Sequence, residues 1–559
     1  MISTLLAAGT TASGASDKIA IPSIRWLSIL PPIIMIGGAV VLLAVASLVS
    51  RPLRVRFATI GTVVISGGAF GVAIWQWYDV RAHGAHTYVA HAVVMDGFSV
   101  LITMLVAMAM LLTALVADGY LRREGFTGAE FHVLALMSAS GAMLMGMAND
   151  LIIIFLGLEI LSIALYVLTA LNHRQAASGE AALKYFILGG FSSAIFVYGI
   201  ALTYGATGST NLTQIADFLS KNVVLTNGLL LAGLALMLVG FAFKIAAVPF
   251  HMWTPDVYQG APTPVTGFMA AVAKAGAFAA MLRVLFSSLG VISSDWKPII
   301  YALAVLSLLV GSVVALRQRD VKRMLAYSSI NHAGFILLGV ESALPRGVSA
   351  SLYYLVAYMF MTIGSFAVVM VLGREGDSDH DLTRYRGLAR RQPLLALSFA
   401  ILLLAQAGAP FTTGLWAKLQ VVLASISAGA VPLAVIAMVT AVIAAFFYLR
   451  VAVLMYASNE PEEGAAGLVA PAARADGGSQ VPWASPDGVS ATITTLNAEL
   501  LLADDAPAAT GEETPSVVPV PFLTSLTIGI CVGFTVLFGV VPAPLLDFAN
   551  HATLLFFGR

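Results

Sequence analysis

Long apolar stretches recur along almost the whole of this 559-residue chain, and they limit its fold more than any other feature. An α-helix rises 1.5 Å per residue, so about 20 apolar residues cross the hydrocarbon core of a bilayer. Stretches of this length lie at 26–49, 57–77, 97–117, 131–148, 151–171, 182–205, 228–248, 263–288, 298–316, 324–341, 348–373, 393–427, 431–456 and 521–541. They show no period-two alternation, which argues against an outer-membrane barrel. We therefore predict an all-α polytopic membrane protein with about 14 transmembrane helices.

The composition agrees with this class and excludes others. Hydrophobic residues make up 59% of the chain and charged residues 10%, whereas about 25% of a soluble domain is charged. The 29 basic residues balance the 29 acidic ones, so no basic surface for nucleic acid is expected. With a single cysteine, Cys531, the chain can form neither an internal disulfide nor a cysteine-ligated iron–sulfur cluster. We therefore expect the chain to be embedded in a lipid bilayer.

Basic residues alternate between the loops and predict the orientation of the chain. One set of loops holds 17 Lys and Arg residues and the other set holds 7. The rich loops include Arg51, Arg54, Arg56, Arg122, Arg123, Arg174, Arg317, Arg319, Lys322, Arg323, Arg374, Arg384, Arg386, Arg390 and Arg391. Since cytoplasmic loops carry the excess of Lys and Arg, we expect both termini to lie outside the cytoplasm. The expected location of the spans is a bacterial inner or plasma membrane.

The segment 457–520 interrupts the apolar pattern. It is rich in Ala, Pro, Gly and Ser and carries ten acidic residues against the single Arg474. Such a composition buries too little apolar surface to order itself, so we predict a mobile acidic loop on the cytoplasmic side. The run 493–502 is the part of it that could form a short helix against a partner.

A few ionisable residues remain inside the predicted spans, where a charge costs at least about 2.5–3.5 kcal/mol. They are Glu159, Lys184, Lys244, Lys274, Arg283 and Lys418. Lys184 follows a polar loop and either reaches the interface or takes part in a proton relay. Arg283 lies near a helix end, which favours an interfacial anchor. One acid cannot neutralise three deep lysines, so a static Glu–Lys pair explains only part of the set, and an unpaired buried lysine can exchange a proton near neutral pH.

Two proline breaks accompany these charges. Pro249 follows Lys244 in AAVPFHMWTPD, and Pro410 precedes Lys418 in AQAGAPFTTGLWAK. Proline removes a helical donor, and freed backbone groups at membrane depth are tolerated inside protein or beside a water-filled cavity. Both breaks fall in the fourth span of a five-span unit, spans 4–8 and 9–13. Because five is odd, the second unit is inverted, as in secondary transporters.

Histidines supply further candidate groups. His251 lies in the first break, and His332 follows Tyr327, Ser328 and Ser329 in AYSSINHAG. They could carry protons along a water chain, or they could be hydrogen-bonded packing residues. His83, His86 and His91 share one external loop, but no acidic or cysteine residue supports them, so no metal site is expected there.

Four motifs resemble subunit N of NADH-quinone oxidoreductase, the respiratory complex I. They are FKIAAVPFHMWTPDVYQGAPTPVTGFMAAVAKAGAF (243–278), LEILSIALYVL (158–168), ALKYFILGGFSSAIFVYGIALTYGATGS (182–209) and DVKRMLAYSSINHAGFILLG (320–339). The resemblance covers roughly 95–450 and the last helix. The run YQGAPTPV is similar to subunit N rather than to its paralogues or to a multisubunit cation/proton antiporter. The acidic loop is longer than the resemblance leads us to expect.

The resemblance implies roles for the buried charges. Glu159 would pair with Lys244 on a broken helix, Lys274 would be the central lysine and Lys418 the terminal one. Breaking the Glu159–Lys244 pair would free the Lys244 proton to move through Lys274 to Lys418. NADH, FMN, iron–sulfur clusters and quinone would be bound by partner subunits and none by this chain, which would contact other membrane-arm subunits. Two alternatives stay open, namely a cation/proton antiporter subunit and a structural subunit joining neighbouring pumps.

The predicted division of the chain follows from the spans and the two units. It comprises an extracytoplasmic segment 1–25, three first spans over 26–117, one antiporter-like repeat at 131–288, a second at 298–456, the acidic loop 457–520, and the last span with its tail at 521–559.

Overall fold

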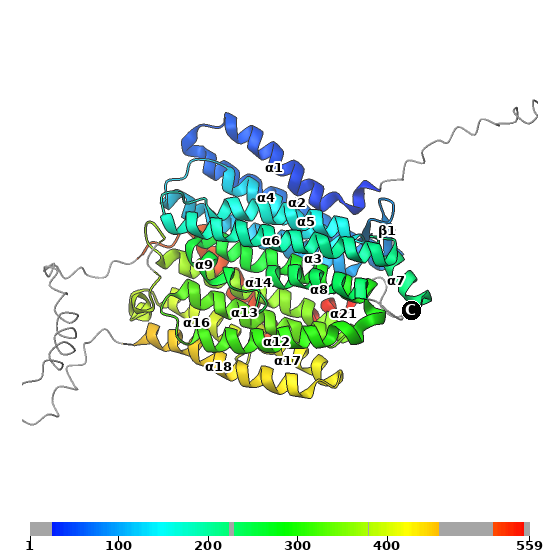
Figure 1. Cartoon of the computed structure of the whole chain (residues 1–559). Helices are drawn as coiled ribbons and strands as arrows, with labels where there is room; N and C mark the ends of the chain where they lie inside the picture. Colours follow the sequence, from blue (N-terminus) through cyan, green and yellow to red (C-terminus); the bar gives the residue numbers. More distant parts are fainter. Residues whose placement is uncertain (1–24, 223–227, 378–379, 458–517, 553–559) are drawn as a thin grey trace, which may run out of the picture.

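The protein is a bundle of long helices lying side by side, with α1 and α2 at one edge and α17 and α18 at the other (Figure 1). The computed structural model describes residues 25–222, 228–377, 380–457 and 518–552. A helix pairs its own backbone N–H and C=O groups, so a chain this apolar satisfies its backbone in lipid by folding into helices. The predicted segment 1–25 and the predicted acidic loop 457–520, with its run 493–502, lie almost entirely outside the described residues.

The first half of the chain forms α1 to α11. Its elements are η1 (Trp26–Ser28), α1 (Leu30–Leu48), α2 (Arg51–His83), β1 (His86–Tyr88), β2 (Val93–Met95), α3 (Gly97–Arg123), α4 (Glu130–Met147), α5 (Leu151–Thr169), α6 (Ala176–Thr207), α7 (Leu212–Lys221), α8 (Gly228–Ile245), α9 (Trp253–Gly260), α10 (Thr263–Phe268), η2 (Met269–Ala273), α11 (Lys274–Arg283) and η3 (Val284–Ser288). The strands β1 and β2 pair antiparallel, with Thr87 opposite Val94.

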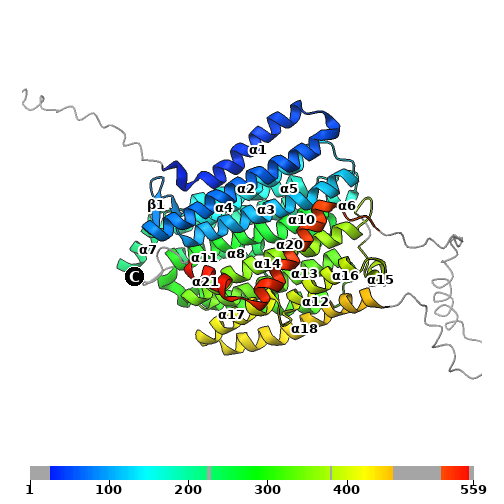
Figure 2. The ribbon, with the colours of Figure 1, turned by 180° about the vertical axis from the view of Figure 1, so that it is seen from behind.

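The second half continues from η4 to α21. Its elements are η4 (Gly290–Ile292), α12 (Ser293–Ala315), α13 (Val321–Glu341), α14 (Pro345–Leu372), η5 (Leu382–Tyr385), α15 (Leu388–Arg391), α16 (Pro393–Ala407), α17 (Thr413–Ser427), α18 (Val431–Tyr456), α20 (Phe522–Val540) and α21 (Ala543–His551). The helix α20 packs on α14 and α3, on the face turned to the viewer in Figure 2.

The all-α membrane class is confirmed. Within the described residues, 12 helices are long and apolar enough to cross a membrane. Each of the predicted stretches is helical, but α13 and the pair α16–α17 are not among these 12. The first carries several polar residues and the second is split into two short helices, so the count of 14 crossings and the repeat relation between the two units stay predictions.

Two stretches of the chain form the centre of the bundle. The run Thr263–Ser288 is buried throughout except at Phe286, and α14 is buried over nearly all its length. Two short π-helical turns, η2 and η3, flank α11 within this central run. Such turns are rare and occur often at functional sites. The central run therefore departs from regular α-helical geometry immediately before Lys274, the first residue of α11.

Both proline sequences interrupt their helices. The first break separates α8 from α9, and the second, at Gly408–Thr412, separates α16 from α17. Trp253 Nε1 donates to the carbonyl oxygen of Phe243 at 3.0 Å and ties the two sides of the first break together. Trp416 Nε1 instead donates to the carbonyl oxygen of Gly539 at 2.9 Å and ties the second break to α20. The two similar sequences are thus anchored differently.

Candidate functional site

Lys274 lies at the centre of the molecule and is almost fully buried, with 2% of its surface exposed. Its Nζ donates to the carbonyl oxygen and to the hydroxyl of Ser329, each at 2.5 Å. It also lies 5.2 Å from the ring centre of Tyr358, within the range of a cation–π contact. Among the described residues no carboxylate lies within 4.0 Å of this ammonium, so only neutral groups solvate it.

Ser329 belongs to a row of hydroxyls around α13. The hydroxyl of Tyr358 donates to Ser329 Oγ at 2.8 Å, and the Tyr258 hydroxyl lies 3.5 Å from the same atom. The preceding residue, Ser328, is hydrogen-bonded to the Tyr448 hydroxyl and donates to Gln406 Oε1 at 3.2 Å. Neighbouring serines on one helix therefore face two different groups of partners.

His332 lies one turn further along α13, within the second group. Its Nδ1 is 2.7 Å from the Tyr354 hydroxyl and its Nε2 is 3.1 Å from the Tyr448 hydroxyl. Because Tyr448 also bonds Ser328, a continuous row runs from Gln406 through Ser328 and Tyr448 to His332 and Tyr354. A ring with a hydroxyl at each nitrogen can accept a proton on one side and release one on the other.

Lys418 stands at the second break. Its Nζ donates to the carbonyl oxygen of Ala407, which ends α16, at 2.8 Å, and it lies 4.9 Å from the ring centre of Phe335. The break thus supplies the backbone acceptor that a continuous helix would have used internally. Gln406, which precedes Ala407, is one end of the row described above, so the backbone acceptor of Lys418 lies next to that end in the chain.

Lys244 ends α8 beside the first break and is surrounded by aromatic rings. Its Nζ lies 5.4 Å from the ring centres of Tyr166 and Tyr185 and has no hydrogen-bond partner among the described residues. Glu159 acts electrostatically on both Lys244 and Tyr166, but no ion pair within 4.0 Å joins it to Lys244 in the described chain. The expected pair is therefore replaced by a lysine held between tyrosine rings with the carboxylate close by.

Stacked rings connect Lys244 with the Ser329 group. Tyr185 stacks on Trp253 with ring centres 4.6 Å apart, and Trp253 meets Tyr258 at 6.3 Å. Since Tyr258 reaches Ser329, α9 lies between the first and the central lysine. Sequence reasoning missed these tyrosines, because an aromatic residue in an apolar helix has the same pattern whether its hydroxyl is used or not.

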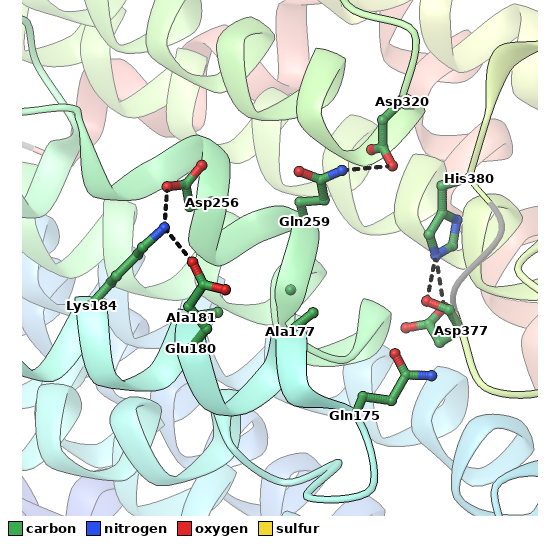
Figure 3. A pocket seen from close by; sticks show the side chains of 11 residues that line it. Gln175, Ala177, Glu180, Ala181, Lys184, Asp256, Gln259, Asp320, Asp377 and His380 are labelled. Carbon is green, nitrogen blue, oxygen red and sulfur yellow. Dashed lines mark hydrogen bonds and ion pairs between the residues drawn. The ribbon is translucent and has the colours of Figure 1, made fainter.

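Lys184 lies apart from the buried lysines, at a cavity of about 370 Å³ where α6 begins and α9 ends (Figure 3). It pairs with Glu180 at 2.7 Å and with Asp256 at 2.8 Å. Asp256 also pairs with Arg323 at 2.7 Å. Lys184 therefore belongs to a partly exposed ion network. The aspartate of the WTPD sequence was the signal that could have revealed it.

A second ion cluster lies at the inner wall of the same cavity (Figure 3). Asp377 accepts from the backbone N–H of Thr263 at 2.8 Å, and it lies 3.5 Å from Lys322 Nζ and 3.1 Å from His380 Nε2. Burial raises the pKa of Asp377, but Lys322, His380 and the hydrogen bond from Thr263 outweigh it, so this pKa lies well below its ordinary value. The sequence placed Lys322 among exposed loop charges, whereas it is buried here.

The remaining two candidates occupy different surroundings. His251 lies half-buried in the first break, and its Nδ1 has no hydrogen-bond partner among the described residues. Arg283 corrects an expectation, because it is fully buried rather than interfacial. It forms a two-pronged pair with Asp96, both contacts at 2.9 Å, and donates to the carbonyl oxygen of Gly146. This pair joins α11 to the start of α3 inside the bundle.

Comparisons with known proteins agree with this architecture. Residues 148–444 match the family model described as NADH:quinone oxidoreductase/Mrp antiporter, TM. The chain is 41% identical to NADH-quinone oxidoreductase subunit N of Trichlorobacter lovleyi, over 78% of this chain and 88% of that one. It is 40% identical to subunit N of Parafrankia sp., over 99% of this chain and all of the relative.

A solved structure leads to the same family. A chain of respiratory complex I from Thermus thermophilus with bound aureothin superposes with a TM-score of 0.71 at 30% identity, covering 92% of this chain and 98% of that one. Together with the two relatives, this structure favours NADH-quinone oxidoreductase over the Mrp antiporters, which the same family model also covers. The chain belongs to the family of NADH-quinone oxidoreductase N subunits.

Proposed function

We propose that this membrane-arm subunit of NADH-quinone oxidoreductase moves protons across the membrane along Lys244, Lys274 and Lys418, with Glu159 biasing the first of them. The redox reaction takes place in other subunits. The observation that carries the proposal is that three buried lysines lack a carboxylate within 4.0 Å among the described residues. A permanently charged, unpaired ammonium costs several kcal/mol in such a site, which favours a group that gains and loses its proton.

The polar row on α13 supports a route between the lysines. Lys274 would pass its proton by way of Ser329 and its tyrosine partners toward His332. From there the proton would follow Tyr448, Ser328 and Gln406 to the neighbourhood of Lys418. Water would bridge the step between the Ser329 group and the Ser328 group, because no hydrogen bond joins them in the described chain.

The free energies involved are of the right size. Moving one proton against 100 mV requires about 2.3 kcal/mol. An opposite charge about 4 Å away is worth about 4 kcal/mol at an effective dielectric constant near 20. A change in the distance between Glu159 and Lys244 can therefore drive the uptake or release of a proton by Lys244. Lys184 and His251, which lie nearer the surface, would relay protons between the buried lysines and the solvent.

The orientation and the divisions of the chain belong to the same proposal. Both termini would lie outside the cytoplasm, so the Lys184 cavity would open to the cytoplasm. The antiporter-like repeats would span 131–288 and 298–456, each with its broken helix in fourth place. Segments 1–25, 26–117, 457–520 and 521–559 would flank or follow these repeats.

The test is proton translocation per NADH oxidised in inverted membrane vesicles. Lys274→Ala and Glu159→Ala are expected to assemble normally but to lower this ratio, because loss of an acid–base group slows its step by about 100-fold or more. The exposed Lys221 at the end of α7 provides the control, and Lys221→Ala should pump normally. Full coupling in both buried-site variants contradicts the proposal.

The two alternatives give other results in the same vesicles. A purely structural role predicts full coupling even when Lys244, Lys274 and Lys418 are all replaced by Ala. A cation antiporter role predicts that exchange of sodium for protons continues without NADH oxidation.

A further inference from the structure

The last membrane helix, α20, contacts the second broken helix through a single glycine. Gly539 is the next-to-last residue of α20 and is buried. A Cβ at this position would lie 2.3 Å from the carbonyl oxygen of Phe411 and 2.4 Å from the Cα of Thr412. Both neighbours are backbone atoms, which no side-chain rotation can move away. The end of α20 therefore packs directly on the loop Gly408–Thr412, which separates α16 from α17.

The same glycine also holds the first turn of α17. Trp416 Nε1 donates to the carbonyl oxygen of Gly539 at 2.9 Å. The last carbonyl groups of a helix have no partner within it, so this bond satisfies a group that α20 leaves free. Trp416 is the fourth residue of α17 and stands two residues before Lys418. One residue of α20 therefore contacts both the loop of the second break and the helix that carries the lysine.

The position of α17 relative to this loop decides whether Lys418 reaches its acceptor. The buried side chain of Lys418 folds back over the loop, so that a Cβ at Gly408 would lie 3.1 Å from Lys418 Cδ. Its Nζ donates to the carbonyl oxygen of Ala407 at 2.8 Å, the one hydrogen bond of this ammonium among the described residues. Because Lys418 and Ala407 lie on opposite sides of the loop, a shift of α17 relative to α16 changes this distance directly.

The first break is held in a different way. Trp253 Nε1 donates to the carbonyl oxygen of Phe243 at 3.0 Å, so its hydrogen bond stays within the break itself. The helix α20 packs mainly on α3, α14, α16 and α17 (Figure 2). A change at the end of α20 should therefore act on Lys418 and leave Lys244 in place.

We propose that α20 positions Lys418 for proton transfer, with Gly539 and Trp416 as the positioning residues. The inference rests on the proposed function, because that function gives Lys418 a proton to exchange. While the bond between Trp416 and Gly539 is formed, α17 is fixed against the loop and Lys418 Nζ stays beside Ala407. When the bond is lost, α17 can shift, and Lys418 moves away from the end of the polar row at Gln406. Proton transfer between this row and the lysine then slows.

The experiment measures protons translocated per NADH oxidised by the assembled complex in inverted membrane vesicles. Trp416→Phe keeps an aromatic ring and removes the indole N–H. Since one hydrogen bond shifts an equilibrium between two arrangements roughly fivefold, this variant should lose at least about half of the coupling that Lys418→Ala loses, at unchanged NADH oxidation. Trp296→Phe is the matched control, because Trp296 Nε1 donates to the carbonyl oxygen of Leu289 at 3.0 Å, outside both breaks. It should pump normally, and an equal loss in this control overturns the proposal.

A pair of glycine variants tests the same contact from the side of α20. Gly539→Ala places a Cβ against the backbone of the loop and should also lower the number of protons translocated per NADH. Gly533→Ala, on the same helix, is its control, because a Cβ there meets nothing within 4 Å. This control should match the unmodified complex.

A double-mutant cycle separates positioning from a general loss of packing. In the Lys418→Ala background, Trp416→Phe should cause no further loss of coupling, because the group that it positions is gone, whereas a general packing effect would add to the first loss. A further loss overturns the proposal, as does full coupling in Trp416→Phe alone. If Lys418→Ala is itself fully coupled, the proposed function fails at this lysine and the positioning role fails with it. If Lys418→Ala lowers coupling but Trp416→Phe does not, only the positioning role is wrong.

Discussion

Asp377 illustrates how a carboxylate is kept ionised inside this protein. It lies between Lys322, His380 and the backbone N–H of Thr263. His380 follows it by three residues, whereas Lys322 and Thr263 come from distant parts of the sequence. Each contact stabilises the charged form, which is why the pKa of Asp377 lies below its ordinary value despite burial. The cluster joins the start of α10 to the loop after α14, so its charge state affects how these two segments are held.

Replacing Asp377 with Asn should destabilise the complex by about 3–5 kcal/mol at pH 7, because Lys322 loses its buried partner. A lowered pKa means that Asp377 contributes its full stability above the unfolded pKa of about 3.9 and loses it as the pH falls toward the folded value. The difference in thermal stability between the unmodified protein and Asp377→Asn should therefore be large at pH 7 and shrink below about pH 4.

The exposed Glu375 offers the control for this pH series. Glu375→Gln removes a carboxylate two residues away that has no buried partner in the cluster. If its stability profile matched that of Asp377→Asn, the ion cluster would not be the cause.

At this scale the sequence revealed the lysines but not their partners. A charge in an apolar helix is visible in the sequence, so Lys244, Lys274 and Lys418 could be named in advance. Tyr358 and Tyr448 could not, because their role depends on which helix faces them. Lys322 was misplaced for the opposite reason, since it occurs among true loop charges.

The two broken helices, α8–α9 and α16–α17, position Lys244 and Lys418. After the second break, Gly414 is the second residue of α17 and lies so close to α16 that a Cβ there would be 1.7 Å from the carbonyl oxygen of Ala405. This contact is with backbone, which cannot rotate away. Only glycine therefore allows α17 to start where Lys418 reaches the end of α16.

Gly414→Ala should push α17 away from α16 and move Lys418 from its acceptor. We expect a destabilisation of about 1–3 kcal/mol or more and reduced proton translocation at unchanged NADH oxidation per assembled complex. Thermal denaturation and vesicle pumping measure the two effects. Gly190→Ala in α6 is the control, because a Cβ there meets nothing within 4 Å. Normal pumping by Gly414→Ala would show that the close contact is not needed for function.

The positions of the breaks were predictable and their anchoring was not. Proline marks the place where a helix stops, so both interruptions could be read from Pro249 and Pro410. Trp253 and Trp416 follow them in similar sequences but bond to different elements. That difference depends on packing against α20, which no local pattern contains.

On the scale of the whole molecule, the bundle has two distinct ends. The hairpin of β1 and β2 lies at one end with α7 and α21, and α9 and α16 lie toward the other (Figures 1 and 2). The arginine-rich loops around α15 are at the second end, as the alternation of basic residues requires if that end is cytoplasmic. The overall class followed from composition, whereas the arrangement of helices around α14 required the structure.

Reporter fusions test this orientation. An alkaline phosphatase fused after residue 559 should be active, because the C-terminus would lie outside the cytoplasm. Fusions after Gly125 or Gln318, in the basic loops, should be inactive, and a fluorescent protein should give the reverse pattern. An active phosphatase at the basic loops would invert the proposed topology and the assignment of the Lys184 cavity to the cytoplasmic side.

The two serines of α13 have a consequence for control of the whole route. Consecutive residues on an α-helix point about 100° apart, so Ser329 contacts Lys274 while Ser328 contacts the partners of His332. The helix thus separates two hydrogen-bonded groups that no hydrogen bond joins in the described chain, and the ring of His332 packs on that of Tyr358 between them, with ring centres 5.0 Å apart. On the proposed route, a water molecule between the two groups would connect them only while it is in place, so its entry and exit would control when a proton crosses.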